Sequence, residues 1–295
     1  MIEKGQHFIT FDIYDKEQII LILNDIFSQD LGNPKTFEVG NKKKFVTNLF
    51  YEPSTRTNSS FYAAEKFIGC EVLNINNVVY SSVSKGESFE DTIRSLQTYA
   101  DCIVLRHPDT GSAKIAAEIS EVPIINAGDG IGEHPTQTLL DLYTVFKHYR
   151  RIDNLTFTLV GDLKYGRTIH GLIKALHKFD CTINLISPGS LKLPIEYQKK
   201  SHNVYDNFND DVLNNTDVLY LTRVQKERGA IISAGTYSFN HENSSKLNKK
   251  SIVMHPLPRV DELPTWFDDD PRAKYFEQMK NGLIVRKYIL KKILY

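Results

Sequence analysis

Residues 44–69 read KFVTNLFYEPSTRTNSSFYAAEKFIG, and their pattern changes once, around the proline in the middle. Before Pro53 the stretch is a short apolar run of strand-forming side chains. After it, Phe61, Ala64 and Ile68 recur at helical spacing until a glycine ends the pattern. A strand followed directly by a helix is the repeating unit of a parallel sheet, so this stretch predicts an α/β fold.

The same alternation continues along the rest of the chain. Ser88 and Asp91 form a capping-box-like helix start, and two more helices are predicted from about residues 136 to 149 and 272 to 295. Four predicted strands precede the 136–149 helix and four follow it, which indicates two parallel-sheet domains, each flanked by helices. The predicted strands are 44–50, 70–75, 102–105, 122–125, 156–160, 182–186, 218–221 and 252–254.

The composition limits the classes of function. Among 295 residues, 36 Lys and Arg balance 36 Asp and Glu, so no net charge attracts nucleic acid or an anionic membrane. Cys70, Cys102 and Cys181 are far apart, which argues against a disulfide framework or a zinc knuckle and fits a reducing environment. No apolar run approaches the roughly 18 residues of a membrane span, and residues 1–12 lack the apolar stretch of a signal peptide. We therefore expect a soluble, cytoplasmic protein.

Ser54, Thr55, Arg56 and Thr57 follow the first predicted strand and open its helix. A helix N-terminus presents N–H groups that have no partner within the helix, together with the positive end of the dipole. The three hydroxyls add donors, and the guanidinium adds a fixed fork of them. A helix cap would explain one hydroxyl, but not three with an arginine. The pattern predicts an anion site with phosphate as its natural ligand.

Three more strand ends carry similar chemistry: residues 106–108 (Arg-His-Pro), 126–137 (ending Glu-His-Pro-Thr-Gln) and 255–259 (His-Pro-Leu-Pro-Arg). Taken singly, an arginine after a strand is often a surface ion pair, and a histidine beside proline is often a turn residue. Because ligands bind beyond the carboxyl ends of parallel strands, the combination predicts a functional site.

Residues 160–168, Val-Gly-Asp-Leu-Lys-Tyr-Gly-Arg-Thr, nearly match the phosphate loop of nucleotide hydrolases, with Arg167 where that motif has lysine. That loop needs an unhindered backbone, whereas this one contains Asp162, Leu163 and Tyr165. A bidentate clamp on a carboxylate is a better use of Arg167.

Two further loops are ambiguous from their residues alone. Residues 80–87 combine serines with Lys85, a composition typical of solvated turns. Residues 222–228, which include Arg223 and Gln225, are typical either of a mixed-charge surface helix or of a second carboxylate clamp with an amide donor.

Together these motifs closely resemble the aspartate carbamoyltransferase family, in order and along nearly the whole chain. The motifs that carry the resemblance are Ser54-Thr55-Arg56-Thr57, Arg106-His107-Pro108, His134-Pro135-Thr136-Gln137, Gly161-Asp162 with Gly166-Arg167-Thr168, Arg223-Val224-Gln225 and His255-Pro256-Leu257-Pro258-Arg259.

The resemblance implies that carbamoyl phosphate and L-aspartate react to give N-carbamoyl-L-aspartate and phosphate, an early step of de novo pyrimidine biosynthesis. It implies a carbamoyl phosphate domain of residues 1–134 and 281–295 and an aspartate domain of residues 135–280. It also implies a homotrimer with shared active sites, and it leaves open whether the trimer stands alone or pairs with regulatory chains or another pathway enzyme. No metal and no cofactor are expected.

By motif position, the resemblance assigns carbamoyl phosphate binding to Ser54, Thr55, Arg56, Thr57, Ser82, Lys85, Arg106, His134, Gln137, Leu257 and Pro258. It assigns aspartate binding to Lys85, Arg167, Arg223, Gln225, Pro256 and Leu257. The residues implied in catalysis are Arg56, Thr57, Lys85, Arg106 and His134. Ser82 and Lys85 would reach the active site of a neighbouring subunit, and the Leu257–Pro258 peptide would be cis.

The chemistry of the residues agrees with this assignment. Attack of a neutral amine on a carbamoyl carbonyl builds an oxyanion, which preorganised guanidinium and imidazole donors stabilise. We therefore expect His134 to act as a neutral hydrogen-bond donor and not as a general base.

Three other interpretations remain open at this point. Ornithine carbamoyltransferases share the Ser-Thr-Arg-Thr loop but typically have cysteine where this chain has Thr136 and Pro256. An ornithine side chain would also require an acid, whereas Arg167 and Arg223 suit a dicarboxylate. A phosphate-loop nucleotide-binding protein would depend on residues 161–168 alone, and a non-catalytic phosphate-sensing or scaffold protein would need the complete donor set to be vestigial.

Overall fold

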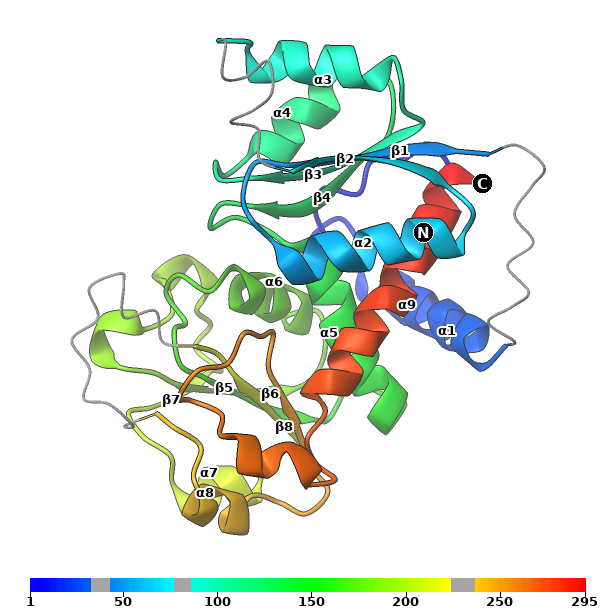
Figure 1. The fold of residues 1–295 in the computed structure, drawn as a ribbon. Helices are drawn as coiled ribbons and strands as arrows, with labels where there is room; N and C mark the ends of the chain where they lie inside the picture. Colours follow the sequence, from blue (N-terminus) through cyan, green and yellow to red (C-terminus); the bar gives the residue numbers. More distant parts are fainter. Residues whose placement is uncertain (33–42, 77–85, 224–236) are drawn as a thin grey trace. The chain divides into compact units, whose positions relative to one another are not determined.

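The chain divides into two compact units in a computed structural model that describes residues 1–32, 43–76, 86–223 and 237–295. The first unit contains residues 1–143 and 281–295, and the second contains residues 144–280 (Figure 1). The divisions fall inside two helices, α5 (Pro135–Tyr149) and α9 (Tyr275–Leu294). The resemblance implies a first boundary after residue 134, at the start of α5; the division between the two compact units lies after Tyr143, within that helix.

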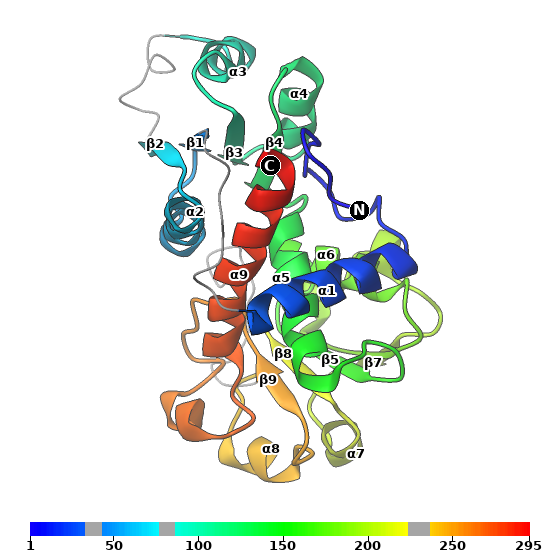
Figure 2. The same ribbon diagram turned by 90° about the vertical axis from the view of Figure 1, so that its right-hand side faces the viewer.

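In the described part of the first unit, four parallel strands form a sheet in the order β2-β1-β3-β4. Helices α3 and α4 cover one face of this sheet, and α2 and the end of α9 cover the other (Figures 1 and 2). The elements of this unit that precede α5 are α1 (Lys16–Leu31), β1 (Phe45–Phe50), α2 (Thr55–Phe67), β2 (Glu71–Asn76), α3 (Phe89–Gln97), β3 (Cys102–His107), α4 (Ser112–Ile119) and β4 (Ile124–Asp129).

The helix starts follow from the sequence. Ser88 precedes α3, and its hydroxyl accepts the backbone N–H of Asp91, which confirms the predicted cap. Asp15 forms a complete capping box with Gln18 at the start of α1. The last helix, α9, begins at Tyr275, three residues after the expected start at Arg272, whose guanidinium instead binds the carboxylate of Asp270.

In the described part of the second unit, five parallel strands pair in the order β7-β6-β5-β8-β9. Helix α6 covers one face, and α7 and α8 cover the other (Figure 1). The elements are β5 (Thr156–Val160), α6 (Arg167–Leu176), β6 (Thr182–Ile186), β7 (Asn203–Tyr205), α7 (Asp210–Asn214), β8 (Val218–Leu221), α8 (His241–Lys246) and β9 (Ile252–Met254). Sequence patterning missed β7, a short edge strand that is mostly exposed and carries no apolar run.

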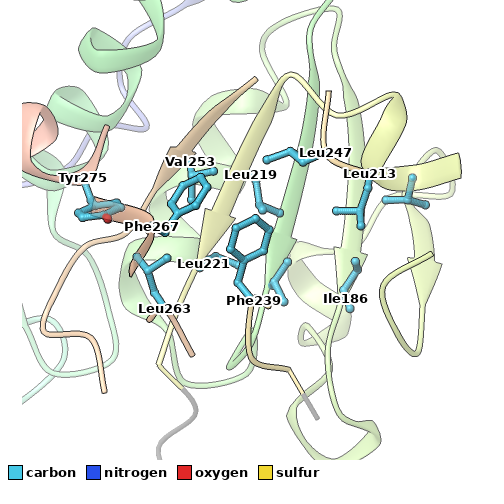
Figure 3. Close-up of a cluster of buried hydrophobic side chains, with 12 residues drawn as sticks. Ile186, Leu213, Leu219, Leu221, Phe239, Leu247, Val253, Leu263, Phe267 and Tyr275 are labelled. Carbon is cyan, nitrogen blue, oxygen red and sulfur yellow. The ribbon is translucent and has the colours of Figure 1, made fainter. Parts of the chain in front are cut away.

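A core of buried side chains lies between this sheet and the segments that follow β8 and β9 (Figure 3). Leu219 and Leu221 project from β8 into the cluster, as alternation along a strand requires. Phe239 and Phe267 meet edge to face, with ring centroids 5.0 Å apart. Leu263 belongs to the same cluster, so the segment that follows β9 packs against the sheet.

A buried carboxyl group lies between β1 and α2 in the first unit. The side chain of Glu65 is fully buried, and burial raises its pKa to about 8. Asn48 donates from Nδ2 to Glu65 Oε2 and to Asn74 Oδ1, each over 2.9 Å. Glu65 Oε1 has no hydrogen-bond partner among the described residues. Burial therefore favours protonation of the Glu65 carboxyl in the folded chain.

This protonation makes the stability of the fold pH-dependent. The pKa of Glu65 is higher in the folded chain than the 4.5 of the free side chain, so the folded state binds more protons between these values. The contribution of Glu65 to the free energy of unfolding should be fully present below pH 4.5. It should decrease as the pH rises to about 8, by at most about 1.4 kcal/mol per pH unit. Thermal denaturation of the wild type and of Glu65→Gln across this pH range tests this. The variant should be relatively more stable at pH 8 than at pH 5, and parallel curves would contradict the assignment.

Candidate active site

The sheet order of the first unit brings three of the predicted motifs to neighbouring strand ends. Strand β1 pairs with β3, and β3 pairs with β4. Phe50, the last residue of β1, is in register with Arg106. The backbone N–H of Tyr51 also donates to the Arg106 carbonyl over 2.9 Å. The loop that leads to residues 54–57 therefore starts beside Arg106.

The loop at residues 54–57 begins α2, as the sequence predicts. Ser54 occupies the N-cap position, but its side chain makes no capping hydrogen bond to the helix. Thr55 and Arg56 are exposed, and Thr57 is buried. The simplest alternative to an anion site, in which Ser54 serves only as a helix cap, therefore lacks the bond that defines a cap.

Arg106 is a largely buried arginine at the end of β3. Its Nη1 donates to the carbonyl of Ala127 on β4 over 3.1 Å, and its Nη2 lies 3.3 Å from Glu52 Oε2. These contacts fix the guanidinium between the ends of β1 and β4. In contrast, the ring of the neighbouring His107 is partly buried against the rings of Tyr51 and Phe89, and its Nδ1 accepts the backbone N–H of Asp109.

His134 and Gln137 lie at the start of α5, one turn apart. The His134 carbonyl accepts the N–H groups of Gln137 and Thr138 at 2.8 and 3.1 Å, which begins the helix. The His134 imidazole is 5% exposed, and its Nδ1 lies 3.3 Å from the hydroxyl of the buried Thr136. A hydroxyl that donates to Nδ1 leaves the ring proton on Nε2, where the neutral imidazole is a hydrogen-bond donor.

Gln137 is held by a residue that the sequence analysis did not identify. Its Nε2 donates to Oδ1 of the fully buried Asp141 over 2.8 Å, one helical turn further on. Gln137 and Asp141 are four residues apart on a predicted helix, and side chains at that spacing lie next to each other, so the sequence contained a signal for this pair. Asp141 in turn interacts with the buried Arg286 of α9. Burial lowers the pKa of Arg286 to about 10, and the negative charge of Asp141 partly opposes this effect. Arg286 also donates to the hydroxyl of Ser60 on α2 over 2.9 Å.

The sheet of the second unit brings together the remaining motifs. Val160 at the end of β5 is in register with Leu221 at the end of β8, and Tyr220 is in register with Met254 at the end of β9. Arg167 follows β5 as the first residue of α6, Arg223 follows β8, and residues 255–259 follow β9. Both arginines are partly exposed. They belong to the segments that follow two neighbouring strands, where the ligands of parallel α/β sheets bind.

The loop from residues 161 to 166 has a geometry unsuited to a nucleotide phosphate loop. Oδ1 of the buried Asp162 accepts the N–H groups of Lys164 and Tyr165 at 3.1 and 2.9 Å. Backbone N–H groups that already donate to a carboxylate do not cradle a phosphate. The Asp162 side chain instead fixes the turn that positions Arg167.

Gly161 is required for this turn. Its φ is +113°, and a Cβ there would lie 2.3 Å from the carbonyl oxygen of Thr222. Thr222 bonds back to Val160 through both its N–H and its hydroxyl, each over 2.9 Å. The loops that carry Arg167 and Arg223 therefore touch at a point where only glycine fits.

The turn after β9 contains the cis Leu257–Pro258 peptide that the resemblance implied, so this prediction is confirmed. Pro256 and Leu257 are partly exposed, and Pro258 is exposed. Arg259 does not point to a ligand, because its guanidinium binds both oxygens of Asp268.

Three predicted site residues, Ser82, Lys85 and Gln225, lie outside the described residues. Within residues 1–32, 43–76, 86–223 and 237–295, no group of three His, Cys, Asp or Glu side chains is placed to hold a metal ion. No helix in those ranges is long and apolar enough to cross a membrane.

Two parallel-sheet units that carry these motifs at their strand ends match a known family of carbamoyltransferases. The family model "Aspartate/ornithine carbamoyltransferase, carbamoyl-P binding domain" matches residues 6–147, and the corresponding "Asp/Orn binding domain" matches residues 153–293. The chain therefore belongs to the aspartate/ornithine carbamoyltransferase family.

Among its relatives, the chain is 46% identical to an aspartate carbamoyltransferase catalytic subunit from Thermoplasma acidophilum, over 92% of this chain and 94% of the relative. The structure of the aspartate transcarbamoylase catalytic subunit from M. jannaschii is 45% identical, with a TM-score of 0.90 over 98% of this chain and 97% of that one. The Trypanosoma cruzi enzyme in complex with carbamoyl phosphate and aspartate is 35% identical, with a TM-score of 0.90 over 99% and 96%.

The steric role of Gly161 gives a testable prediction. Gly161→Ala should lower the free energy of unfolding by about 1 to 3 kcal/mol, because the side chain combines an unfavourable backbone angle with a clash against Thr222. Gly189→Ala is the matched control, since no atom lies within 4 Å of the added Cβ and φ is not positive. Denaturant unfolding of both variants measures the difference. Equal stability of the two would contradict the role of Gly161.

Proposed function

We propose that this chain transfers the carbamoyl group of carbamoyl phosphate to the amine of L-aspartate, giving N-carbamoyl-L-aspartate and phosphate. This reaction is an early step of de novo pyrimidine biosynthesis. The names of the relatives support the proposal, as does the Trypanosoma cruzi complex with both substrates.

The observation that carries the choice of aspartate is the arginine pair. Arg167 and Arg223 follow β5 and β8, which are neighbours in the sheet of the second unit. Two guanidinium groups complement the two carboxylates of aspartate, whereas the ammonium group of ornithine would be repelled. We assign aspartate binding to Arg167 and Arg223, with Gln225 and Lys85 as further donors, and the aspartate amine to the backbone carbonyls of Pro256 and Leu257.

The first unit binds carbamoyl phosphate in this proposal. The first turn of α2 and the side chains of residues 54–57 hold the phosphate group. Arg106, with Arg56, Thr57 and His134, contacts the carbamoyl oxygen, and Gln137 binds the carbamoyl amide. The contacts of Arg106 with Ala127 and Glu52 and of Gln137 with Asp141 support these roles, because they fix both side chains before a substrate binds.

The chemical step follows from this arrangement. The neutral amine attacks the carbamoyl carbon, and negative charge develops on the carbonyl oxygen, where Arg56, Arg106 and His134 donate hydrogen bonds. A phosphate oxygen takes up the amine proton as the C–O bond to phosphate breaks. Phosphate therefore departs as the dianion HPO4²⁻, which Arg56 and the helix end stabilise. In this proposal His134 is neutral and donates from Nε2, while the Thr136 hydroxyl donates to Nδ1.

We also propose a cytoplasmic homotrimer in which Ser82 and Lys85 complete the site of a neighbouring subunit, with Leu257 and Pro258 also near carbamoyl phosphate. Strand β2 is an edge strand of the first sheet, and Leu73 on it is exposed. Tyr62 and Phe67 on α2 are also exposed. Exposed apolar side chains of this kind next to a sheet edge are suited to contact with another subunit. Regulatory chains or another pathway enzyme are further candidate partners.

The substrate assignment is tested by release of phosphate from carbamoyl phosphate with L-aspartate, with L-ornithine and without an acceptor. Release is expected with aspartate alone. Arg56→Ala should lower kcat by about 100-fold or more, because it removes a charged donor from the developing oxyanion. Release with ornithine alone would mean that the arginine pair has been misinterpreted, and release with neither acceptor would contradict the proposed reaction.

Subunit complementation tests the shared site. Lys85→Ala and His134→Ala should each lower kcat by about 100-fold or more as separate proteins. When the two variants are dissociated, mixed and reassembled, a mixed trimer has a site with Lys85 from one chain and His134 from another. Phosphate release with aspartate should then return. No recovery in trimers shown to be mixed by mass spectrometry would contradict shared sites, and full turnover by His134→Ala alone would contradict its role.

A further inference from the structure

The histidine of the 255–259 turn is placed inside the fold. Strand β9 ends at Met254, and the next side chain, His255, is only 1% exposed. Its Nδ1 accepts the backbone N–H of Leu257 over 2.8 Å. Its Nε2 lies 2.8 Å from Oε1 of the buried Glu262. Because a backbone N–H donates to Nδ1, the ring proton is on Nε2 and points to Glu262.

Glu262 orients the imidazole as a charged acceptor. Burial alone would raise the pKa of Glu262, but the hydrogen bonds from His255 and from the backbone lower it below its ordinary value. The Val260 N–H also points at this carboxylate, 3.1 and 3.3 Å from its two oxygens. The backbone carbonyl of Glu262 accepts the N–H of Phe239, which fixes the Glu262 backbone beside the buried cluster of Figure 3.

The backbone on both sides of the turn is fixed as well. The His255 N–H donates to Oε1 of the buried Gln278 over 3.0 Å, and Arg259 binds Asp268. Between these anchors, Leu257 has a φ of +55°, a left-handed conformation that a leucine rarely adopts. Such a conformation persists only where its surroundings hold it. The His255 ring provides that restraint directly, because it binds the N–H of Leu257 itself.

We propose that His255 is a positioning residue for the amino-acid substrate. Glu262 orients His255, and His255 holds the peptide of Leu257 so that the carbonyls of Pro256 and Leu257 face the aspartate amine. This inference rests on the proposed function, which assigns those carbonyls to the amine. A role for His255 as a general base is excluded by its geometry, since each ring nitrogen has a partner at 2.8 Å.

The two hydrogen bonds of the ring can be separated by substitution. In His255→Asn the amide oxygen lies near the position of Nδ1 and accepts the N–H two residues on, while the bond to Glu262 is lost. In His255→Gln the terminal amide reaches toward Glu262, while the bond to Leu257 is lost. His255→Ala loses both bonds. The proposal depends on the Leu257 bond, so the Asn and Gln variants should differ.

The test measures KM for aspartate, kcat, the affinity for carbamoyl phosphate by calorimetry without aspartate, and the melting temperature. The KM for aspartate should rise about tenfold in His255→Gln and His255→Ala, the value of one lost hydrogen bond. It should stay at least about fivefold lower in His255→Asn than in His255→Gln. Affinity for carbamoyl phosphate should change less than the KM for aspartate, because the charged donors assigned to it at residues 54–57, 106 and 134 are in the first unit and only Leu257 and Pro258 belong to this turn.

A purely structural role gives a different result. It would lower the melting temperature of all three variants, but the KM for aspartate would be the same in His255→Asn and His255→Gln. This outcome overturns the proposal. If the histidine variants do not fold, Glu262→Gln, which keeps an acceptor for Nε2, and Glu262→Leu, which removes it, provide the same comparison. Equal aspartate KM values for that pair overturn it also. Turnover of the wild type with aspartate is measured first, so a failure of the proposed reaction is distinguished from a failure of the positioning role.

Discussion

Parallel pairing of β1 with β3 and of β5 with β8 is the constraint on which the candidate site depends. The register of Phe50 with Arg106 and of Val160 with Leu221 makes each pair of strands end at the same level. Polar side chains that are far apart in the chain therefore emerge side by side. A shift of either register by one residue would turn the strand side chains to the opposite face and separate the loops that follow. The chemistry of the site thus relies on backbone hydrogen bonds that involve none of its functional groups.

Much of this arrangement could be predicted from the sequence because its causes are local. The apolar runs of eight strands, the Ser88 cap and the helical spacing after Ser54 each lie within a few neighbouring residues, and the structure contains a matching element for each of them. The resemblance to a carbamoyltransferase depended on short motifs at strand ends, and the family matches confirm it. The assignment of individual residues to substrates remains a prediction.

The features that the sequence did not predict depend on partners distant in the chain or on weak patterns. Strand β7 is short and exposed, so no apolar run marks it. A glutamate on a helix is usually exposed to solvent, and only the packing of Glu65 against Asn48 shows that it is buried. His255 was recognised as part of a motif, but its dependence on Glu262 and Gln278 requires the folded turn. Ordinary sequence patterning detects the side chains that meet substrate more readily than those that hold them in place.

The first unit is discontinuous in sequence, whereas the second is a single continuous stretch. Residues 281–295 nevertheless belong to the first unit, where the Gly5 N–H donates to the Ile293 carbonyl and Lys292 pairs with Asp25. During synthesis on the ribosome, these residues emerge only after residues 144–280. The second unit has its whole sequence available earlier, so the part of the chain made first is the part whose folding finishes last.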